Sequence, residues 1–353
     1  MMGSICKYAY PNAKVRALKG RLLSDKTFRA LLNCERPEDV LNVLRTTDYA
    51  EALRELPGTD VSTLQLSLIL YRSLFGDYEK TVRSLDRSLQ PFFILLYQQY
   101  ELTNLKTILR GVFSQAAVEE VQALLLPTER YTLFSKNALL ALHTVQELIA
   151  YLQDSVFHYP LNQALRRFEE EGEIFPLEMA LDLHYYQTLW EAMRKLPRGE
   201  EKIIRKLLGI RIDILNVAWI VRFKEEYRLS FEEILNYTIH HGAYFRLQDR
   251  QLLSKAKNAG EVLDVLRQSV YGKALPEQIQ DFSTLHILLN RYLLAQIRSY
   301  FSGNPFQIGV ILGYLWIKEF EIDDIISIVE AKRYGLSPEE SRRYVIHGET
   351  SRD

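Results

Sequence analysis

Apolar residues recur at intervals of three and four along most of the chain, which is the spacing that places them on one face of an α-helix. Val40, Val43 and Leu44 follow this spacing, and so do Ile203 and Leu207. The alternation of apolar and polar residues that is typical of strands is nearly absent. The pattern therefore predicts an all-α protein.

Breaks between the predicted helices carry the residues that end helices. Glycine and proline, at 16 and 11 residues, gather at places such as Pro57-Gly58 and Gly303-Asn304-Pro305. Ser230 with Glu233, and Ser337 with Glu340, have the spacing of capping boxes, in which each side chain satisfies a free backbone amide of the first turn. Helices are therefore predicted to begin just after Ser230 and Ser337.

One phrase occurs three times in the chain. It reads ELTNLKTIL from Glu101, DILNVAWIV from Asp213 and EIDDIISIV from Glu321, so the copies start 112 and 108 residues apart. Each copy has an acid first, Asn or Asp three residues later, and aliphatic residues at shared positions. Such self-similarity at a fixed period indicates internal duplication.

A second phrase recurs with the same period. Its copies start at Asp39, Glu147 and Glu261, which are 108 and 114 residues apart, and each has an aromatic residue ten places on. Three helical units are therefore predicted, over residues 1–125, 126–235 and 236–353. Units of this size are too large for the helix pairs of a solenoid, so a closed three-part body is expected.

The repeated helix predicts a buried stripe with a polar pair at its edge. Leu102, Leu105 and Leu109 share one helix face, and Glu101 and Asn104 lie beside it. A carboxylate near a core needs a hydrogen-bond partner. One alternative, which we favour, is that each pair fixes packing against an adjacent helix or loop; the other is that three related helices line a cavity with polar groups for a partner.

Composition and charge argue against nucleic-acid binding, secretion and a membrane-spanning segment. Of the 353 residues 47% are apolar, and 44 Lys and Arg stand against 45 Asp and Glu, so no overall field favours nucleic acid. Cys6 and Cys34 are too few for an oxidised scaffold, no secretory signal is visible, and we expect a reducing, cytosolic setting. The longest apolar runs, 91–97 and 308–317, fall short of the ~20 residues that cross a bilayer, so membrane association would be peripheral.

Motifs for chemistry are sparse. No GxxxxGK[ST] segment is present to hold a nucleotide, and the adjacent His240 and His241 do not share a helix face as zinc ligands would. We expect no cofactor, no metal and no catalytic residue. The basic run Lys195, Arg198, Lys202, Arg205, Lys206 and Arg211 is expected to form a solvated helix face, with contact to anionic lipid heads or acidic partner loops as the alternative. The chain is expected to fray beyond Tyr344.

Three segments resemble a known family. They are YAYPNAKVRALKGRLLS at 8–24, YELTNLKTILRG at 100–111 and PFQIGVILGYLWIKEFEIDDIISIVEAKRYGLSPEE at 305–340. They are similar to the C subunit of V-type and archaeal-type rotary ATPases, which eukaryotic complexes call the d subunit, and the likeness runs from end to end. Asp324 stands where this family more often has Asn.

The resemblance implies an all-helical, pseudo-threefold funnel with a central cavity. It further implies a non-catalytic central-stalk subunit, a socket that couples the central shaft to the membrane proteolipid ring during ATP-driven ion transport or ATP synthesis. The subunit would lie peripherally on the cytoplasmic face of a membrane, without binding nucleotide or nucleic acid. Two alternatives remain: a helical scaffold for soluble partners and an enzyme of unknown chemistry. The candidates for partner contact or cavity lining are Arg16, Glu101, Asn104, Arg110, Asp213, Asn216, Arg222, Glu321 and Asp324.

Overall fold

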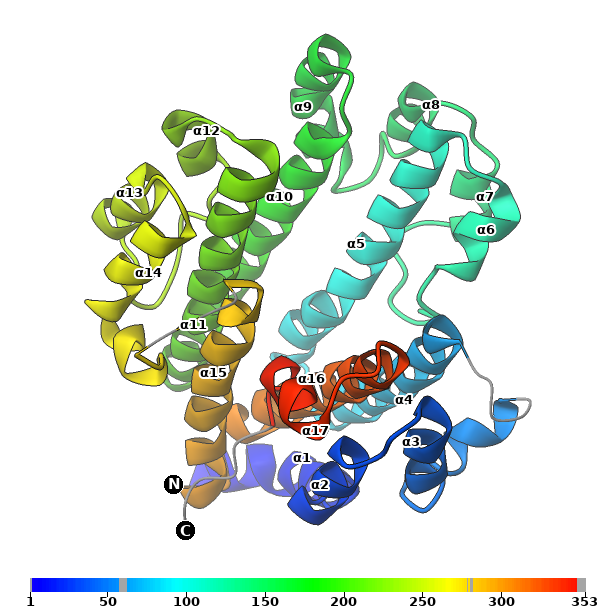
Figure 1. The fold of residues 1–353 in the computed structure, drawn as a ribbon, viewed down its shortest axis with the longest axis vertical. Coiled ribbons are helices and arrows are strands. Elements are labelled where there is room, and N and C mark those ends of the chain that lie inside the picture. Colours follow the sequence, from blue (N-terminus) through cyan, green and yellow to red (C-terminus); the bar gives the residue numbers. More distant parts are fainter. Residues whose placement is uncertain (1, 57–61, 278, 280–281, 348–353) are drawn as a thin grey trace. The chain divides into compact units, whose positions relative to one another are not determined.

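The computed structural model describes residues 2–56, 62–277, 279 and 282–347, without the side chains of residues 2–6 and 283. The side chain of Cys6 is therefore outside the described residues. Helices joined by turns and loops make up the described chain, which contains no strand (Figure 1). The prediction of an all-α protein is confirmed.

The described chain forms two compact units. Unit 1 combines the residues up to Asp86 with those from Leu196 onward, and unit 2 spans Arg87–Lys195. The division into three units with boundaries at 125 and 235 stays a prediction.

Unit 2 is built on two long helices, α5 and α10, which contact each other. Its helices are α5 (Gln90–Ser114), α6 (Val118–Ala123), α7 (Lys136–Leu140), α8 (Val145–Tyr151), α9 (His158–Glu171) and α10 (Phe175–Arg194). Helices α6, α7 and α8 cover α5, and α9 lies along α10. The Lys106 ammonium links α5 to α10 through the Asp182 carboxylate, with its nitrogen 2.7 Å from the nearer oxygen.

Unit 1 contains the remaining helices of the described chain. From the first part of the sequence come α1 (Met2–Lys19), α2 (Asp25–Leu32), α3 (Pro37–Leu44), η1 (Ala52–Glu55) and α4 (Thr63–Ser84). From the later part come α11 (Arg198–Arg222), η2 (Phe223–Tyr227), α12 (Phe231–Asn236), α13 (Leu247–Lys255), α14 (Ala259–Arg267), η3 (Val270–Ala274), η4 (Phe282–Thr284), α15 (Leu285–Ser302), α16 (Ile308–Arg333), α17 (Pro338–Ser341) and η5 (Arg342–Tyr344).

Helix α16 is the centre of unit 1. It contacts α1, α2, α3 and α4 from the start of the chain as well as α11 and α15. Every residue of the apolar run 308–317 is buried, as expected of a helix that is apolar all round. The Arg211 guanidinium of α11 forms a bidentate ion pair with Glu319 of α16, at 2.8 and 2.9 Å, so this arginine does not belong to a solvated face.

The predicted capping boxes are both present. The Ser230 and Ser337 hydroxyls accept hydrogen bonds from the backbone amides of Glu233 and Glu340, and each glutamate accepts one in return. No helix in the described part of the chain combines the length and the apolar character needed to cross a bilayer.

The expectation that the chain frays beyond Tyr344 is wrong for residues 345–347. Val345 and Ile346 are buried, and the backbone amides of Ile346 and His347 donate to the Asp324 carboxylate. A buried carboxylate holds this segment in place, which no local property of its sequence indicates. Residues 348–353 lie outside the described part.

Candidate functional site

The three copies of the repeated phrase lie on α5, α11 and α16, and their polar pairs are fully buried. The exposed fraction is 0% for Glu101, Asn104, Asp213 and Asn216 and 1% for Glu321 and Asp324. Buried polar groups are stable only when they are hydrogen-bonded, and buried charges need several donors. The partners of these six side chains therefore show what the repeated phrase does.

The asparagine in each of the first two copies forms two hydrogen bonds with the backbone of one loop residue. Asn104 donates from Nδ2 to the Leu126 carbonyl (3.0 Å) and accepts from the Leu126 amide (2.8 Å). Asn216 does the same to Ile239, at 2.9 and 2.8 Å. A side-chain amide has one donor group and one acceptor, so it replaces the partner that a backbone residue would find in secondary structure.

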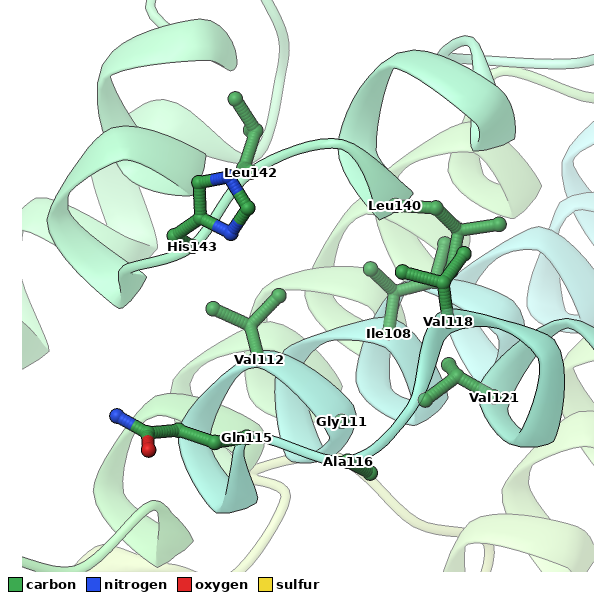
Figure 2. Close-up of a pocket in the computed structure, with 10 residues that line it drawn as sticks. All are labelled: Ile108, Gly111, Val112, Gln115, Ala116, Val118, Val121, Leu140, Leu142 and His143. Carbon is green, nitrogen blue, oxygen red and sulfur yellow. The ribbon is translucent and has the colours of Figure 1, made fainter.

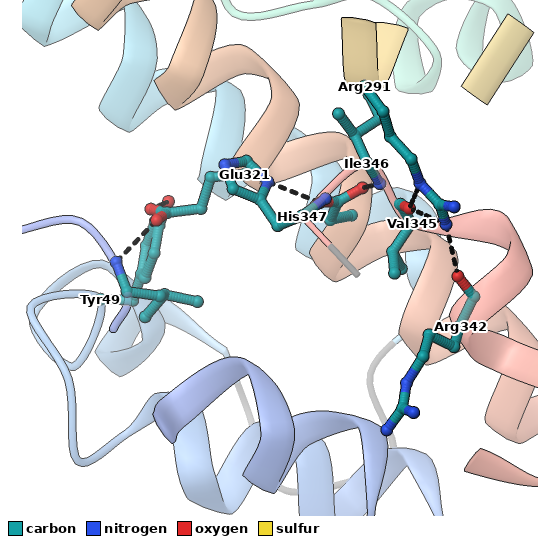
Figure 3. A network of polar contacts seen from close by, with 9 residues as sticks. Tyr49, Arg291, Glu321, Arg342, Val345, Ile346 and His347 are labelled. Atoms are coloured by element: carbon teal, nitrogen blue, oxygen red, sulfur yellow. Dashed lines mark hydrogen bonds and ion pairs between the residues drawn. The ribbon is translucent and has the colours of Figure 1, made fainter. Parts of the chain in front are cut away.

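In the third copy Asp324 takes the equivalent place, and its carboxylate has no donor to offer. It accepts hydrogen bonds from the Ile346 amide (2.5 Å) and the His347 amide (2.8 Å), and the His347 ring nitrogen Nδ1 lies 2.7 Å away. The guanidinium of Arg291 supplies donors to this segment instead, with Nη2 2.9 Å from the Val345 carbonyl oxygen (Figure 3). Asp therefore replaces Asn in the third copy, and an arginine supplies the hydrogen-bond donor that the Asp side chain lacks.

Asp213, the acid of the second copy, lies in a cradle of backbone amides. It accepts from Ala243 (3.2 Å) and Tyr244 (2.8 Å) and from the hydroxyl of Tyr271 (2.8 Å). Glycine at 242 makes this approach possible, since a Cβ there would lie 2.0 Å from Asp213 Oδ1. Burial raises the pKa of Asp213 to about 7, because desolvation outweighs the donors.

Glu321, the acid of the third copy, reaches back to the start of the chain. It accepts from the Leu23 amide (2.6 Å) and the Tyr49 hydroxyl (2.7 Å), and the Lys318 ammonium is 3.4 Å away. Figure 3 shows Glu321 and Tyr49 side by side. The burial of Tyr49 next to this carboxylate raises its pKa well above its ordinary value.

Glu101, the acid of the first copy, accepts from the Thr128 hydroxyl and from the Leu133 amide, the latter at 3.4 Å. The Lys136 ammonium donates to the Thr128 carbonyl at 2.7 Å, and burial lowers the pKa of this lysine. Each acid in the three copies is therefore used to hold loop residues against its helix, which is the outcome that the packing alternative describes.

Residues of the two repeated phrases contact each other in two cases out of three. Tyr49 and Tyr271 are the aromatic residues ten places into the second phrase, and both donate to the acid of a first phrase, Glu321 and Asp213. In the remaining copy this aromatic residue is Phe157, which has no hydroxyl. Sequence reasoning found both phrases but missed the link; the tyrosine hydroxyl in two of the three copies was the available signal.

The three arginines among the predicted site residues are exposed. Arg110 forms an ion pair with Glu178 (2.5 Å), and Arg222 forms one with Glu226 (2.7 Å). Arg16 donates from Nε to the Asn12 side chain at 3.4 Å. The Arg222–Glu226 pair is exposed on both sides and contributes little to stability, so exchanging it for contacts with another molecule would cost little. In the Arg110–Glu178 pair the arginine is exposed, whereas the glutamate is half-buried.

A pocket of about 310 Å³ lies in unit 2, between the end of α5, α6 and the loop before α8 (Figure 2). Its lining is mostly aliphatic, and His143 is the one titratable side chain among the ten lining residues. None of the predicted site residues lines it. Within the described residues no three His, Cys, Asp or Glu side chains are grouped so that they could hold a metal. This pocket therefore gives no acid–base pair on which to base a catalytic proposal.

The comparison with protein families identifies the chain. The model of the ATP synthase (C/AC39) subunit matches residues 11–344. The chain belongs to this family. Members of the C/AC39 family are accessory rather than catalytic subunits of the ATP synthase, a rotary ATPase, and the resemblance predicted from the sequence is confirmed.

Archaeal relatives agree along nearly the whole chain. The C subunit of the A-type ATP synthase of Methanosphaera stadtmanae is 27% identical, with 94% of this chain and 85% of that protein covered. The corresponding subunit of Methanocaldococcus jannaschii is 26% identical over 98% of this chain and 88% of its own length. That of Methanothermobacter thermautotrophicus is 28% identical over 94% and 86%. Other subunits of such a complex are the expected partners.

Proposed function

We propose that this chain is a non-catalytic central-stalk subunit that couples the shaft of a rotary ATPase to its membrane proteolipid ring. In this role it acts as a socket on the cytoplasmic face of the membrane, during ATP-driven ion transport or ATP synthesis. The observation that carries the proposal is the family match over residues 11–344.

The repeated contact supports a three-part architecture. In all three copies the Asn or Asp of the phrase forms hydrogen bonds with the backbone of a loop residue that lies 22 or 23 residues further along the chain. In the third copy the acid, Glu321, accepts hydrogen bonds from Leu23 and Tyr49 near the start of the sequence. Three equivalent modules are what a pseudo-threefold funnel with a central cavity requires, and we propose that arrangement.

Stiffness is the property that such a socket needs, because a body that transmits torque must not yield at its joints. Buried hydrogen-bonded networks restrict the loops that they hold. We therefore assign Glu101, Asn104, Asp213, Asn216, Glu321 and Asp324 to holding the shape of the socket. Arg16, Arg110 and Arg222, being exposed, are the candidates for direct contact with shaft or ring.

A helical scaffold for soluble partners is the second candidate, since an all-α body with repeats would also suit that role. Co-assembly separates the two. The purified chain, mixed with the shaft subunits and with detergent-solubilised proteolipid ring, is expected to join both in one complex during size-exclusion chromatography. Absence of binding to either component would refute the socket role. An Arg110→Ala/Arg222→Ala variant tests the arginine assignment. Its control is Arg166→Ala, which removes the exposed ion pair with Glu170 on α9.

A further inference from the structure

Positive charge is concentrated in three segments of unit 1. Residues 7–21 contain five Lys or Arg and no Asp or Glu, residues 198–206 contain four Lys or Arg with Glu200 and Glu201, and Arg298 lies near the end of α15. The whole chain is balanced, with 44 Lys and Arg against 45 Asp and Glu. The excess is therefore local.

Contacts bring these three segments together at one end of unit 1. The Lys7 ammonium and the Tyr8 hydroxyl of α1 lie 2.8 and 2.9 Å from Glu200 at the start of α11. The Lys19 ammonium lies 5.1 Å above the ring centroid of Phe301 at the end of α15. In Figure 1, α1 lies beside the lower end of α15. We call this end of unit 1, formed by residues 7–21, 198–206 and 298–301, the basic end.

Most cations of the basic end are exposed. Arg16, Lys19, Arg21, Arg198, Lys202, Arg205, Lys206 and Arg298 all have exposed side chains. The two acids are already engaged, because Glu200 pairs with Lys7 and Glu201 pairs with Arg205. The three segments hold ten Lys or Arg against these two acids, and Asp86 is near enough to Tyr8 to act on it electrostatically. The remaining excess of positive charge repels itself, and an anionic surface would relieve that repulsion.

Aromatic side chains accompany the cations. Tyr10 is 65% exposed and has the Lys14 ammonium 5.7 Å from its ring centroid. Phe301 lies under Lys19 in the same way. Aromatic rings next to lysine and arginine are the residues that proteins place at the boundary between membrane and water. An acidic protein loop would instead favour cations fixed in a defined pocket, and the long side chains here are spread over three segments.

We propose that the basic end of unit 1 binds the headgroups of anionic membrane lipids. The attraction is electrostatic and does not depend on a particular headgroup. Clustered Lys and Arg near an anionic leaflet act over about a Debye length, roughly 8–10 Å in physiological salt. The inference goes beyond the socket role, since it concerns a property of the chain alone.

Vesicle co-sedimentation of the full chain tests this inference. Vesicles of phosphatidylcholine are compared with vesicles in which phosphatidylcholine is mixed with phosphatidylglycerol. Binding is expected only to the mixed vesicles, and it should weaken steeply as salt is raised, because salt screens exposed charges. Equal binding to both vesicles, or no binding to the anionic ones, would overturn the proposal.

A pair of matched variants locates the surface. Lys202→Gln/Lys206→Gln removes two exposed lysines from the basic end. At about five-fold per charge near the membrane, vesicle binding is expected to weaken about 30-fold. Lys255→Gln/Lys257→Gln removes two exposed lysines at the other end of α11, where Lys224 contacts Ser254. This control lies roughly 30 Å away along the helix axis and should bind vesicles as the unchanged protein does.

The outcomes also separate lipid binding from the socket role. Equal losses in the two variants would overturn the location. A chain that ignores vesicles but whose Lys202→Gln/Lys206→Gln variant binds the detergent-solubilised ring more weakly would show that the cations serve an acidic protein surface, and the lipid proposal would be wrong. A chain that binds anionic vesicles but joins neither shaft nor ring would support this inference while refuting the socket.

Discussion

Replacing Asn216 with Leu tests whether the repeated polar pair holds the fold together. The substitution keeps the size of the side chain and removes both hydrogen bonds to Ile239, which is 3% exposed. The Ile239 amide and carbonyl are then left buried without these partners. Each such group costs about 1–3 kcal/mol, and the leucine recovers part of this as apolar burial, so we expect a net loss of about 2–4 kcal/mol.

Chemical denaturation, followed by circular dichroism, measures this loss as a change in the free energy of unfolding. Hydrogen exchange at the Ile239 amide reports the local effect, since its protection should fall with the loss of the bond. Asn42→Leu is the matched control, because Asn42 is exposed on α3, and a change within about 0.5 kcal/mol is expected there. A loss below about 0.5 kcal/mol for Asn216→Leu, with unchanged protection at Ile239, would refute the reasoning.

Three further predictions concern the Asp213 contact. First, its pKa of about 7 lies above the value of 3.8 for the unfolded chain, so the stabilising contribution is complete below about pH 4 and is lost as pH rises through 7. The free energy of unfolding of the unchanged protein should therefore fall between pH 4 and 7 relative to that of Asp213→Asn, by at most about 1.4 kcal/mol per pH unit. Urea titrations at several pH values measure this difference. Parallel plots of the two free energies against pH would contradict the prediction. Second, Tyr271→Phe removes a hydroxyl donor to a buried carboxylate and should cost about 2 kcal/mol in thermal or urea unfolding, whereas the exposed Tyr159→Phe should cost almost nothing. Third, Gly242→Ala places a methyl group 2.0 Å from Asp213 Oδ1 and should lower the free energy of unfolding by at least about 2 kcal/mol. The control Gly76→Ala adds a methyl group in open space on α4 and should raise the free energy of unfolding by up to about 1 kcal/mol. Equal effects of the two substitutions would show that the close approach does not matter.

Local sequence patterns predicted the local structure well. The helical spacing and the capping boxes at Ser230 and Ser337 depend on residues close in sequence, and both are present. The repeats could also be found, because duplicated contacts leave similar residues at similar positions.

The partners of the buried acids could not be predicted, because they are set by tertiary packing. Glu321 accepts from the amide of Leu23, which is 298 residues away. A backbone amide has no side-chain signature, so nothing in the sequence near Leu23 marks it as a partner. The packing of residues 345–347 was missed for the same reason, since Asp324 and Arg291, more than 20 residues away, form hydrogen bonds with them.

The coupling role is tested most directly by ion pumping in vesicles. A rotary ATPase is reconstituted with its shaft, head and proteolipid ring, with and without this chain, and both ATP hydrolysis and the ion gradient are recorded. With the chain present, hydrolysis should build a gradient; without it, hydrolysis should continue while no gradient forms. A gradient of equal size in the absence of the chain would contradict the proposed socket.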